Sequence, residues 1–190
     1  MAGRTDRWIF TEVAARHGIA ADAAMLTRVR DAYLSHLVRE IDVDSPDKRV
    51  LPGVRPLLET LSTADVCLGL LTGNVAAGAR IKLEHFGLWR YFVGGGFGDH
   101  AVDRVALYAE AIASIAAATG VTFSPDQTVI VGDTPHDVQV ALASGARCLA
   151  VATGSVAPDA LAAAGADIVL QDLSDLTRAL AALGIALSSH

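Results

Sequence analysis

The chain has 190 residues, of which 52% are hydrophobic and 19% are charged, and its formal net charge is −6 at pH 7. This size and apolar content are enough to bury a hydrophobic core, which argues against a disordered chain. The negative charge argues against nucleic-acid binding, which needs a basic face. No apolar stretch is long enough to span a bilayer, and the first ten residues lack the apolar core of a signal peptide, so we expect a cytoplasmic protein without a membrane partner.

The N-terminal third is predicted to be helical. Residues 7–19 and 23–41 carry apolar side chains at helical spacing, and no strand pattern separates them. We expect these segments to form a partial helical cap over residues 1–45. Pro46 and Pro52 prevent a continuous helix in the segment SPDKRVLPGV, which we interpret as the linker to an α/β core over residues 46–190.

Five short apolar runs, each ending in turn residues, follow in the second domain at residues 65–74, 91–99, 128–137, 147–155 and 167–175. Continuous apolarity is typical of strands that are buried on both faces of a parallel sheet. Segments of helical character separate the runs, such as residues 76–88 and 103–120. The pattern predicts a doubly wound, Rossmann-like parallel sheet, in which ligands bind at the carboxyl ends of the strands.

Two acids follow the third run, in the sequence VIVGDTPHD. Asp133 ends the predicted strand and Asp137 lies one turn into the next helix, and two carboxylates at this spacing repel each other unless a cation or a proton sits between them. They therefore form a candidate Mg²⁺ site, because Mg²⁺ prefers carboxylate oxygens. The alternative is a strand-end turn followed by an acid that stabilises a helix N-terminus. Cys67 and Cys148 lie inside apolar runs, and the histidines lack zinc-site spacing, so we predict no zinc site.

A candidate phosphate site follows the first run, in the sequence LLTGN. The hydroxyl of Thr72 and the backbone N–H groups of Gly73 and Asn74 suit phosphate oxygens, and the alternative is a polar residue that only precedes a Gly-Asn turn. Arg104 adds a permanent cation near the start of a predicted helix, with an ordinary surface arginine as the alternative. Lys82 is its rival, but we set it aside because it lies in the middle of a predicted helix.

In this order, these motifs resemble those of the haloacid dehalogenase-like (HAD) hydrolases. LLTGN resembles the second motif of the family, VIVGDTPHD the fourth, and Arg104 takes the place of the basic third motif. The segments GRTDRWIF, LPGV, ARIKLEHFGL and GGGFGDH look like the phosphoglycolate-phosphatase-like branch, and the resemblance runs from Gly3 to about Asp175.

The resemblance implies an enzyme, a Mg²⁺-dependent phosphatase that acts on a small phosphorylated metabolite through an aspartyl-phosphate. It implies that Asp133 and Asp137 bind the metal, that Thr72 and Arg104 hold the transferring phosphoryl group, and that a helical cap selects the substrate. The three residues that precede the first helix either line the substrate pocket from the cap or only cap that helix: Arg4, Thr5 and Asp6.

One departure from the family concerns its first motif, a strand followed by Asp-x-Asp that supplies the nucleophile. Asp42 and Asp44 have this spacing, but the residues before them read as a helix, so we assign no nucleophile in this chain and expect little turnover from it alone. By resemblance, the absent strand belongs between the strands that end at Thr72 and Asp133. Such a gap would leave backbone groups unpaired, unless the sheet closes, another chain fills it through self-association, or the natural protein is longer. The alternative function is a non-catalytic relative that binds a phosphorylated ligand or acts as a scaffold.

Overall fold

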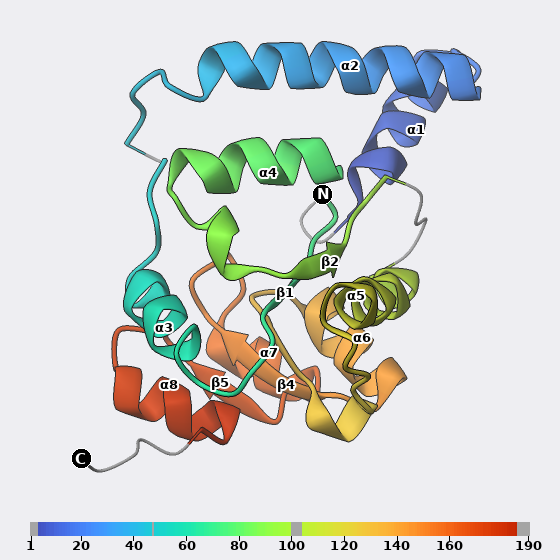
Figure 1. The fold of residues 1–190 in the computed structure, drawn as a ribbon. Helices are drawn as coiled ribbons and strands as arrows, with labels where there is room; N and C mark the ends of the chain where they lie inside the picture. The colour runs from blue at the N-terminus through green and yellow to red at the C-terminus, as the bar shows by residue number, and fades with distance from the viewer. Residues whose placement is uncertain (1–3, 47, 100–103, 186–190) are drawn as a thin grey trace. The chain divides into compact units, whose positions relative to one another are not determined.

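The computed structural model describes residues 4–46, 48–99 and 104–185, and its chain forms two compact units (Figure 1). The first unit comprises residues 1–48 and 69–119, and the second comprises residues 49–68 and 120–190. Each unit therefore combines segments that are distant in the sequence. The predicted division into residues 1–45 and 46–190 stays a prediction.

The first unit contains a two-stranded parallel sheet and four α-helices among the described residues. Strand β1 (Gly69–Leu71) pairs with β2 (Gly94–Gly96), and helix α5 (Arg104–Thr119) packs against both strands. Helix α2 (Ala23–Glu40) contacts α1 (Asp6–Arg16) and lies alongside α4 (Ala76–His85), as Figure 1 shows. A short 3-10 helix, η1 (Trp89–Tyr91), lies between α4 and β2.

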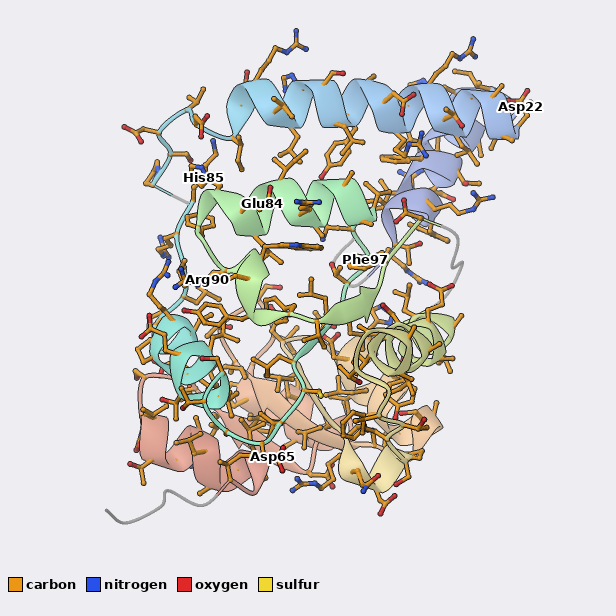
Figure 2. All side chains as sticks on the ribbon, viewed as in Figure 1. Asp22, Asp65, Glu84, His85, Arg90 and Phe97 are labelled. Carbon is orange, nitrogen blue, oxygen red and sulfur yellow. The ribbon has the colours of Figure 1, made fainter. Side chains whose placement is uncertain are left out.

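The two N-terminal helices begin where side chains cap their first N–H groups. Thr5 accepts a hydrogen bond from the backbone nitrogen of Trp8 at 3.2 Å, and Asp22, labelled in Figure 2 at the start of α2, accepts one from Met25 at 2.7 Å. Such caps satisfy N–H groups that have no partner inside the helix. The sequence therefore sets the start of both predicted helices through its polar residues.

The second unit contains a three-stranded parallel sheet in the order β3-β4-β5. The strands are β3 (Val129–Gly132), β4 (Arg147–Val151) and β5 (Ile168–Leu170). The helices of this unit are α3 (Val54–Leu61), η2 (Pro125–Gln127), α6 (Pro135–Ser144), α7 (Pro158–Ala163) and α8 (Leu176–Leu183). The short connections between strand and helix place β3 and β4 next to each other with α6 as their crossover.

Helices cover both faces of this second sheet. Leu149 and Val151 of β4 belong to a core cluster that also contains Leu57 and Leu61 of α3 and Leu180 of α8. Successive side chains of a strand point to opposite faces, so Cys148 and Ala150 point the other way. Both are at most 2% exposed, and α6 contacts β3 and β4. The observed α/β class with parallel strands confirms the predicted fold class.

Strands β1 and β3 belong to different sheets in the described part of the chain, where β1 pairs with β2 and β3 pairs with β4. That a further strand belongs between them stays a prediction, as does self-association through such a gap. Among the described residues, no helix combines the length and the apolar content that crossing a bilayer requires.

Candidate functional site

The turn after β1 organises the side chain of Thr72. Its backbone nitrogen donates to the carbonyl of Gly96 at 3.1 Å, which continues the pairing of β1 with β2. Its hydroxyl oxygen accepts two hydrogen bonds from Asn74, one from the backbone nitrogen at 3.2 Å and one from Nδ2 at 2.9 Å. A hydroxyl has one proton and two lone pairs, so both lone pairs are in use and the proton remains to be donated. An anionic oxygen is the partner that such a hydroxyl suits.

Lys82 places a cation on this turn. Its Nζ donates to Oδ1 of Asn74 at 2.5 Å, although it lies near the C-terminal end of α4. Helical side chains lean toward the helix N-terminus, and the four carbons of a lysine carry its ammonium back by more than one turn. The position of Lys82 in the sequence, inside a helix, does not reveal this contact, because the contact depends on the direction of its side chain.

The N-terminal segment is held against the same turn. The backbone nitrogen of Asp6 donates to the carbonyl of Gly73 at 2.6 Å, and the carboxylate of Asp6 accepts from the backbone nitrogen of Val75 at 2.9 Å. A Cβ on Gly73 would lie 2.4 Å from the carbonyl oxygen of Arg4, so only glycine allows this approach. Thr5 is 2% exposed and caps α1. This contact corresponds to the second interpretation given for Thr5 from the sequence, in which it caps the helix that follows.

Arg4 itself is exposed, and its guanidinium lies 4.8 Å from the ring centre of Trp8. This distance is typical of a cation–π contact. Arg4 is thus exposed and contacts Trp8, while Thr5 caps α1 and Asp6 binds the turn after β1; that any of the three lines a substrate pocket stays a prediction.

The two acids of the second unit begin α6. Asp137 is 6% exposed, and its Oδ2 accepts hydrogen bonds from the backbone nitrogen of Thr134 at 3.0 Å and from its hydroxyl at 2.7 Å. In return, the backbone nitrogen of Asp137 donates to the side chain of Thr134, and the two residues together form a capping box. The helix-capping interpretation of Asp137 thus describes a real interaction, and it leaves a buried carboxylate fixed at the tip of β3.

Two glycines keep space beside these carboxylates. A Cβ on Gly154 would lie 2.4 Å from Oδ2 of Asp133, and a Cβ on Gly132 would lie 2.3 Å from the side chain of Asp137. Larger residues at either glycine would displace the acids. The described residues contain no group of three or more His, Cys, Asp and Glu side chains that could hold a metal. A pair of carboxylates nevertheless fits Mg²⁺, which takes its remaining ligands from water and phosphate.

Comparisons with known proteins decide the family. Residues 105–176 match the HAD-hydrolase-like family. The probable phosphatase IndB of Dickeya dadantii is 31% identical over 137 residues, which cover 70% of this chain and 57% of IndB. The phosphoglycolate phosphatase of Synechococcus elongatus is 27% identical over 179 residues, which cover 93% of this chain and 78% of that enzyme. The chain belongs to the HAD-like hydrolase superfamily.

A solved structure agrees with this assignment. The crystal structure of a predicted phosphatase from Clostridium acetobutylicum has a TM-score of 0.69 to this HAD-like chain at 20% identity, over 94% of this chain and 78% of the other. At this identity the similarity shows the fold. The match to phosphoglycolate phosphatase agrees with the phosphoglycolate-phosphatase-like branch. The chain spans little more than half the length of IndB, so the activity of the whole protein is a matter for proposal.

The predicted third-motif residue of this HAD-like chain, Arg104, is the first residue of α5. Its side chain lies outside what the structure describes. Among the described side chains, Lys82 is the cation that contacts the Thr72 turn.

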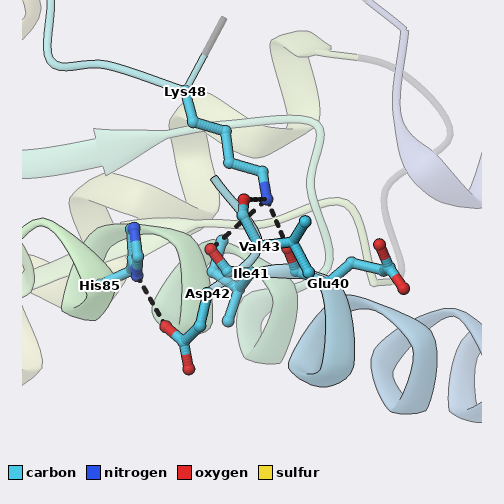
Figure 3. Close-up of polar contacts among 6 residues, drawn as sticks. All are labelled: Glu40, Ile41, Asp42, Val43, Lys48 and His85. Carbon is cyan, nitrogen blue, oxygen red and sulfur yellow. Dashed lines mark hydrogen bonds and ion pairs between the residues drawn. The ribbon is translucent and has the colours of Figure 1, made fainter. Parts of the chain in front are cut away.

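The Asp-x-Asp pair of this HAD-like chain lies in the turn after α2 (Figure 3). Asp42 is 83% exposed, and its carboxylate pairs with Nδ1 of His85 at 3.1 Å. In the same turn, Nζ of Lys48 donates to the backbone carbonyls of Glu40, Ile41 and Val43. A cation at this place also suits the negative end of the α2 dipole. The turn therefore ties the end of α2 to the end of α4, and a strand does not precede it.

A cavity of about 290 Å³ opens in the first unit near the start of α4. Its lining includes Phe10, Leu26 and Val75 together with three charged residues, Arg7, Arg30 and Asp99. Asp99 accepts a hydrogen bond from the backbone nitrogen of Ala76 at 2.7 Å, and Arg30 pairs with the exposed Asp31. Apolar walls with a few charged groups are typical of small-ligand pockets. Arg7 and Arg30 are not among the residues predicted from the sequence, because surface arginines on helices carry no distinguishing pattern.

Proposed function

We propose that the protein is a Mg²⁺-dependent phosphatase that hydrolyses a small phosphorylated metabolite in the cytoplasm. The observation that carries the proposal is the strand-end turn of Thr72, whose hydroxyl keeps its proton for an anionic ligand. The family similarity supplies the reaction class, since the match to phosphoglycolate phosphatase covers most of this chain.

In this proposal, the residues of the first unit hold the transferring phosphoryl group. The hydroxyl of Thr72 and the backbone N–H groups of Gly73 and Asn74 donate hydrogen bonds to its oxygens, and Arg104 contributes a positive charge. Donors that are already oriented before the substrate arrives stabilise developing negative charge without reorganisation, which makes them effective in catalysis.

In the second unit, Asp133 and Asp137 would hold Mg²⁺. When bound, the cation would neutralise negative charge on the phosphate and so assist attack on phosphorus. The capping box fixes the carboxylate of Asp137, and Gly132 and Gly154 leave room for the two acids.

The cavity lined by Arg7 and Arg30 is a candidate site for the rest of the substrate. Guanidinium groups suit a carboxylate or a second phosphate. Phosphoglycolate, the substrate named for the Synechococcus relative, carries a carboxylate beside its phosphate, and it is therefore the first substrate to test. Arg4 is a further candidate contact for an anionic substrate.

A second candidate function is the binding of a phosphorylated ligand without turnover. The observation that favours it is the only Asp-x-Asp sequence in the chain, whose Asp42 is solvent-exposed and paired with His85 instead of following a strand. We therefore propose that residues 1–190 supply the binding part of the reaction and turn over little substrate by themselves.

The test is a thermal-shift experiment with phosphate and Mg²⁺, paired with an assay of phosphate release from phosphoglycolate. We expect phosphate with Mg²⁺ to raise the unfolding temperature, because a ligand that binds the folded state stabilises it. Asp133→Asn should abolish this shift, whereas Asp159→Asn, an exposed acid at the start of α7, should keep it. A flat response of the unsubstituted protein would contradict the proposal, and rapid phosphate release would contradict the assignment of a binding role alone.

A further inference from the structure

We infer that Lys82 is a positioning residue, which acts through Asn74 to aim the hydroxyl proton of Thr72 at a phosphoryl oxygen. The inference rests on the proposed function, in which Thr72 holds the phosphoryl group. It gives a role to a residue that lies in one of the family-like segments, ARIKLEHFGL, and to which the resemblance assigns no role.

The first step concerns the amide of Asn74. An asparagine amide has an oxygen that only accepts and a nitrogen that only donates, and rotation of the group by half a turn exchanges them. An ammonium has donors and no acceptor. The contact of 2.5 Å between Nζ of Lys82 and the amide therefore requires that the amide oxygen faces Lys82.

The second step follows from the first. With its oxygen facing Lys82, the amide of Asn74 presents Nδ2 to Thr72, and Nδ2 donates to the hydroxyl oxygen at 2.9 Å. The backbone nitrogen of Asn74 donates to the same oxygen at 3.2 Å. The Thr72 proton cannot be donated back to these groups, and no acceptor for it lies among the described residues. It is thus available to a ligand.

The third step is the effect of removing Lys82. Without the ammonium, the amide of Asn74 is free to rotate and to present its oxygen to Thr72. The hydroxyl would then donate its proton to Oδ1 of Asn74, and a phosphoryl oxygen would meet a lone pair. Charge-assisted hydrogen bonds to anions are the strong ones, so the loss of this donor should weaken phosphate binding considerably.

Tyr33 of α2 helps to hold the ammonium in place. Nζ of Lys82 lies 5.8 Å from the ring centre of Tyr33, within the range of a cation–π contact. Gly78 leaves room for this ring, because a Cβ there would lie 3.2 Å from it. The ammonium of Lys82 is thus held by two contacts, one with Tyr33 of α2 and one with Asn74 in the turn after β1.

The sequence offers an unusually clean experiment, because Asn74 is its only asparagine. Protein labelled with ¹⁵N-asparagine gives a single pair of side-chain amide signals. In the ligand-free protein, we expect Lys82→Met to shift this pair and Lys82→Arg, which retains a donor-only cation, to keep it near its original position. The control is Arg80→Met, which removes an exposed cation of the same helix that pairs with Glu84.

The second readout is the dissociation constant of inorganic phosphate in the presence of Mg²⁺, measured by calorimetry. We expect Lys82→Met to raise it about tenfold or more, Lys82→Arg to restore most of the affinity, and Arg80→Met to leave it unchanged. Circular dichroism establishes that each variant is folded.

Two results would overturn the inference alone: unchanged amide signals in Lys82→Met, or shifted signals with unchanged phosphate affinity. Absence of phosphate binding in the unsubstituted protein would overturn the proposed function and, with it, the role inferred for Lys82 in phosphate binding. The amide signals, which need no phosphate, tell these failures apart.

Discussion

At the scale of single residues, burial and nearby acids of the second unit determine the reactivity of Cys148. Cys148 is 2% exposed, and burial, followed by the negative charges of Asp137 and Asp167, raises the pKa of its thiol from 9.0 to about 11. The thiolate is the reactive form of a cysteine, so this thiol should be inert near neutral pH. Cys67 is only partly buried.

We therefore predict that Cys67 alone reacts with a thiol reagent in the native protein at pH 8, and that Cys148 reacts after unfolding. Counting reactive thiols before and after adding denaturant checks this. In a Cys67→Ser variant, the native protein should show almost no reaction, and a fast reaction there would contradict the predicted burial.

Because the pKa of Cys148 in the folded state exceeds its value in the unfolded state, the protonated thiol favours the folded state fully below pH 9, and this contribution to stability is lost as the pH rises toward about 11.

At the scale of elements, α6 joins the stability of the second unit to its candidate metal site. Its capping box uses Thr134 and Asp137, and its first turn also carries Pro135, which fits there because the missing N–H has no helical partner. Substitution of Asp137 would thus disturb both the helix and the cation. Thr134 offers a way to separate the two effects.

We predict that Thr134→Ala lowers the free energy of unfolding by about 1 kcal/mol, because it removes a capping hydroxyl. Urea unfolding measures the change. The thermal shift with Mg²⁺ and phosphate should persist, since both carboxylates remain. Thr122→Ala, an exposed threonine outside the helices, is the control, and an equal effect of the two substitutions would refute the capping role.

How far the sequence predicts these elements depends on their length. The long helices α1, α2 and α5 correspond to segments predicted as helical, and the predicted strands all occur, although they are shorter than their apolar runs. Helix α3 is not predicted from the sequence, because Pro52 before it and Pro56 within it look like breaks. Pro56 is the third residue of this helix, where a proline costs no helical hydrogen bond. The short helices α7 and α8 are not predicted either, although Leu176, Leu180 and Leu183 of α8 lie at helical spacing.

Only some residues of the candidate site could be predicted from the sequence. Thr72, Asn74, Asp133 and Asp137 follow strands, so their positions could be predicted from strand ends and turn residues alone. The contacts of Lys82 could not, because they depend on the direction of a long side chain along its helix and on the packing of α2 against α4. Tertiary contacts of this kind leave no local signature in a sequence.

At the scale of the whole molecule, the proposed function requires that phosphate and Mg²⁺ bind to the protein at the same time. Hydrolysis of a phosphate ester needs both the phosphate donors and the cation to act on one ligand. Phosphate and Mg²⁺ must then influence each other's affinity, and by linkage the influence is reciprocal.

The measurement that tests this account most directly is the affinity of the protein for inorganic phosphate, titrated with and without Mg²⁺. We predict that Mg²⁺ tightens phosphate binding, that Asp133→Asn removes the tightening, and that Thr72→Val weakens binding under both conditions. A phosphate affinity that does not change when Mg²⁺ is added would contradict the account.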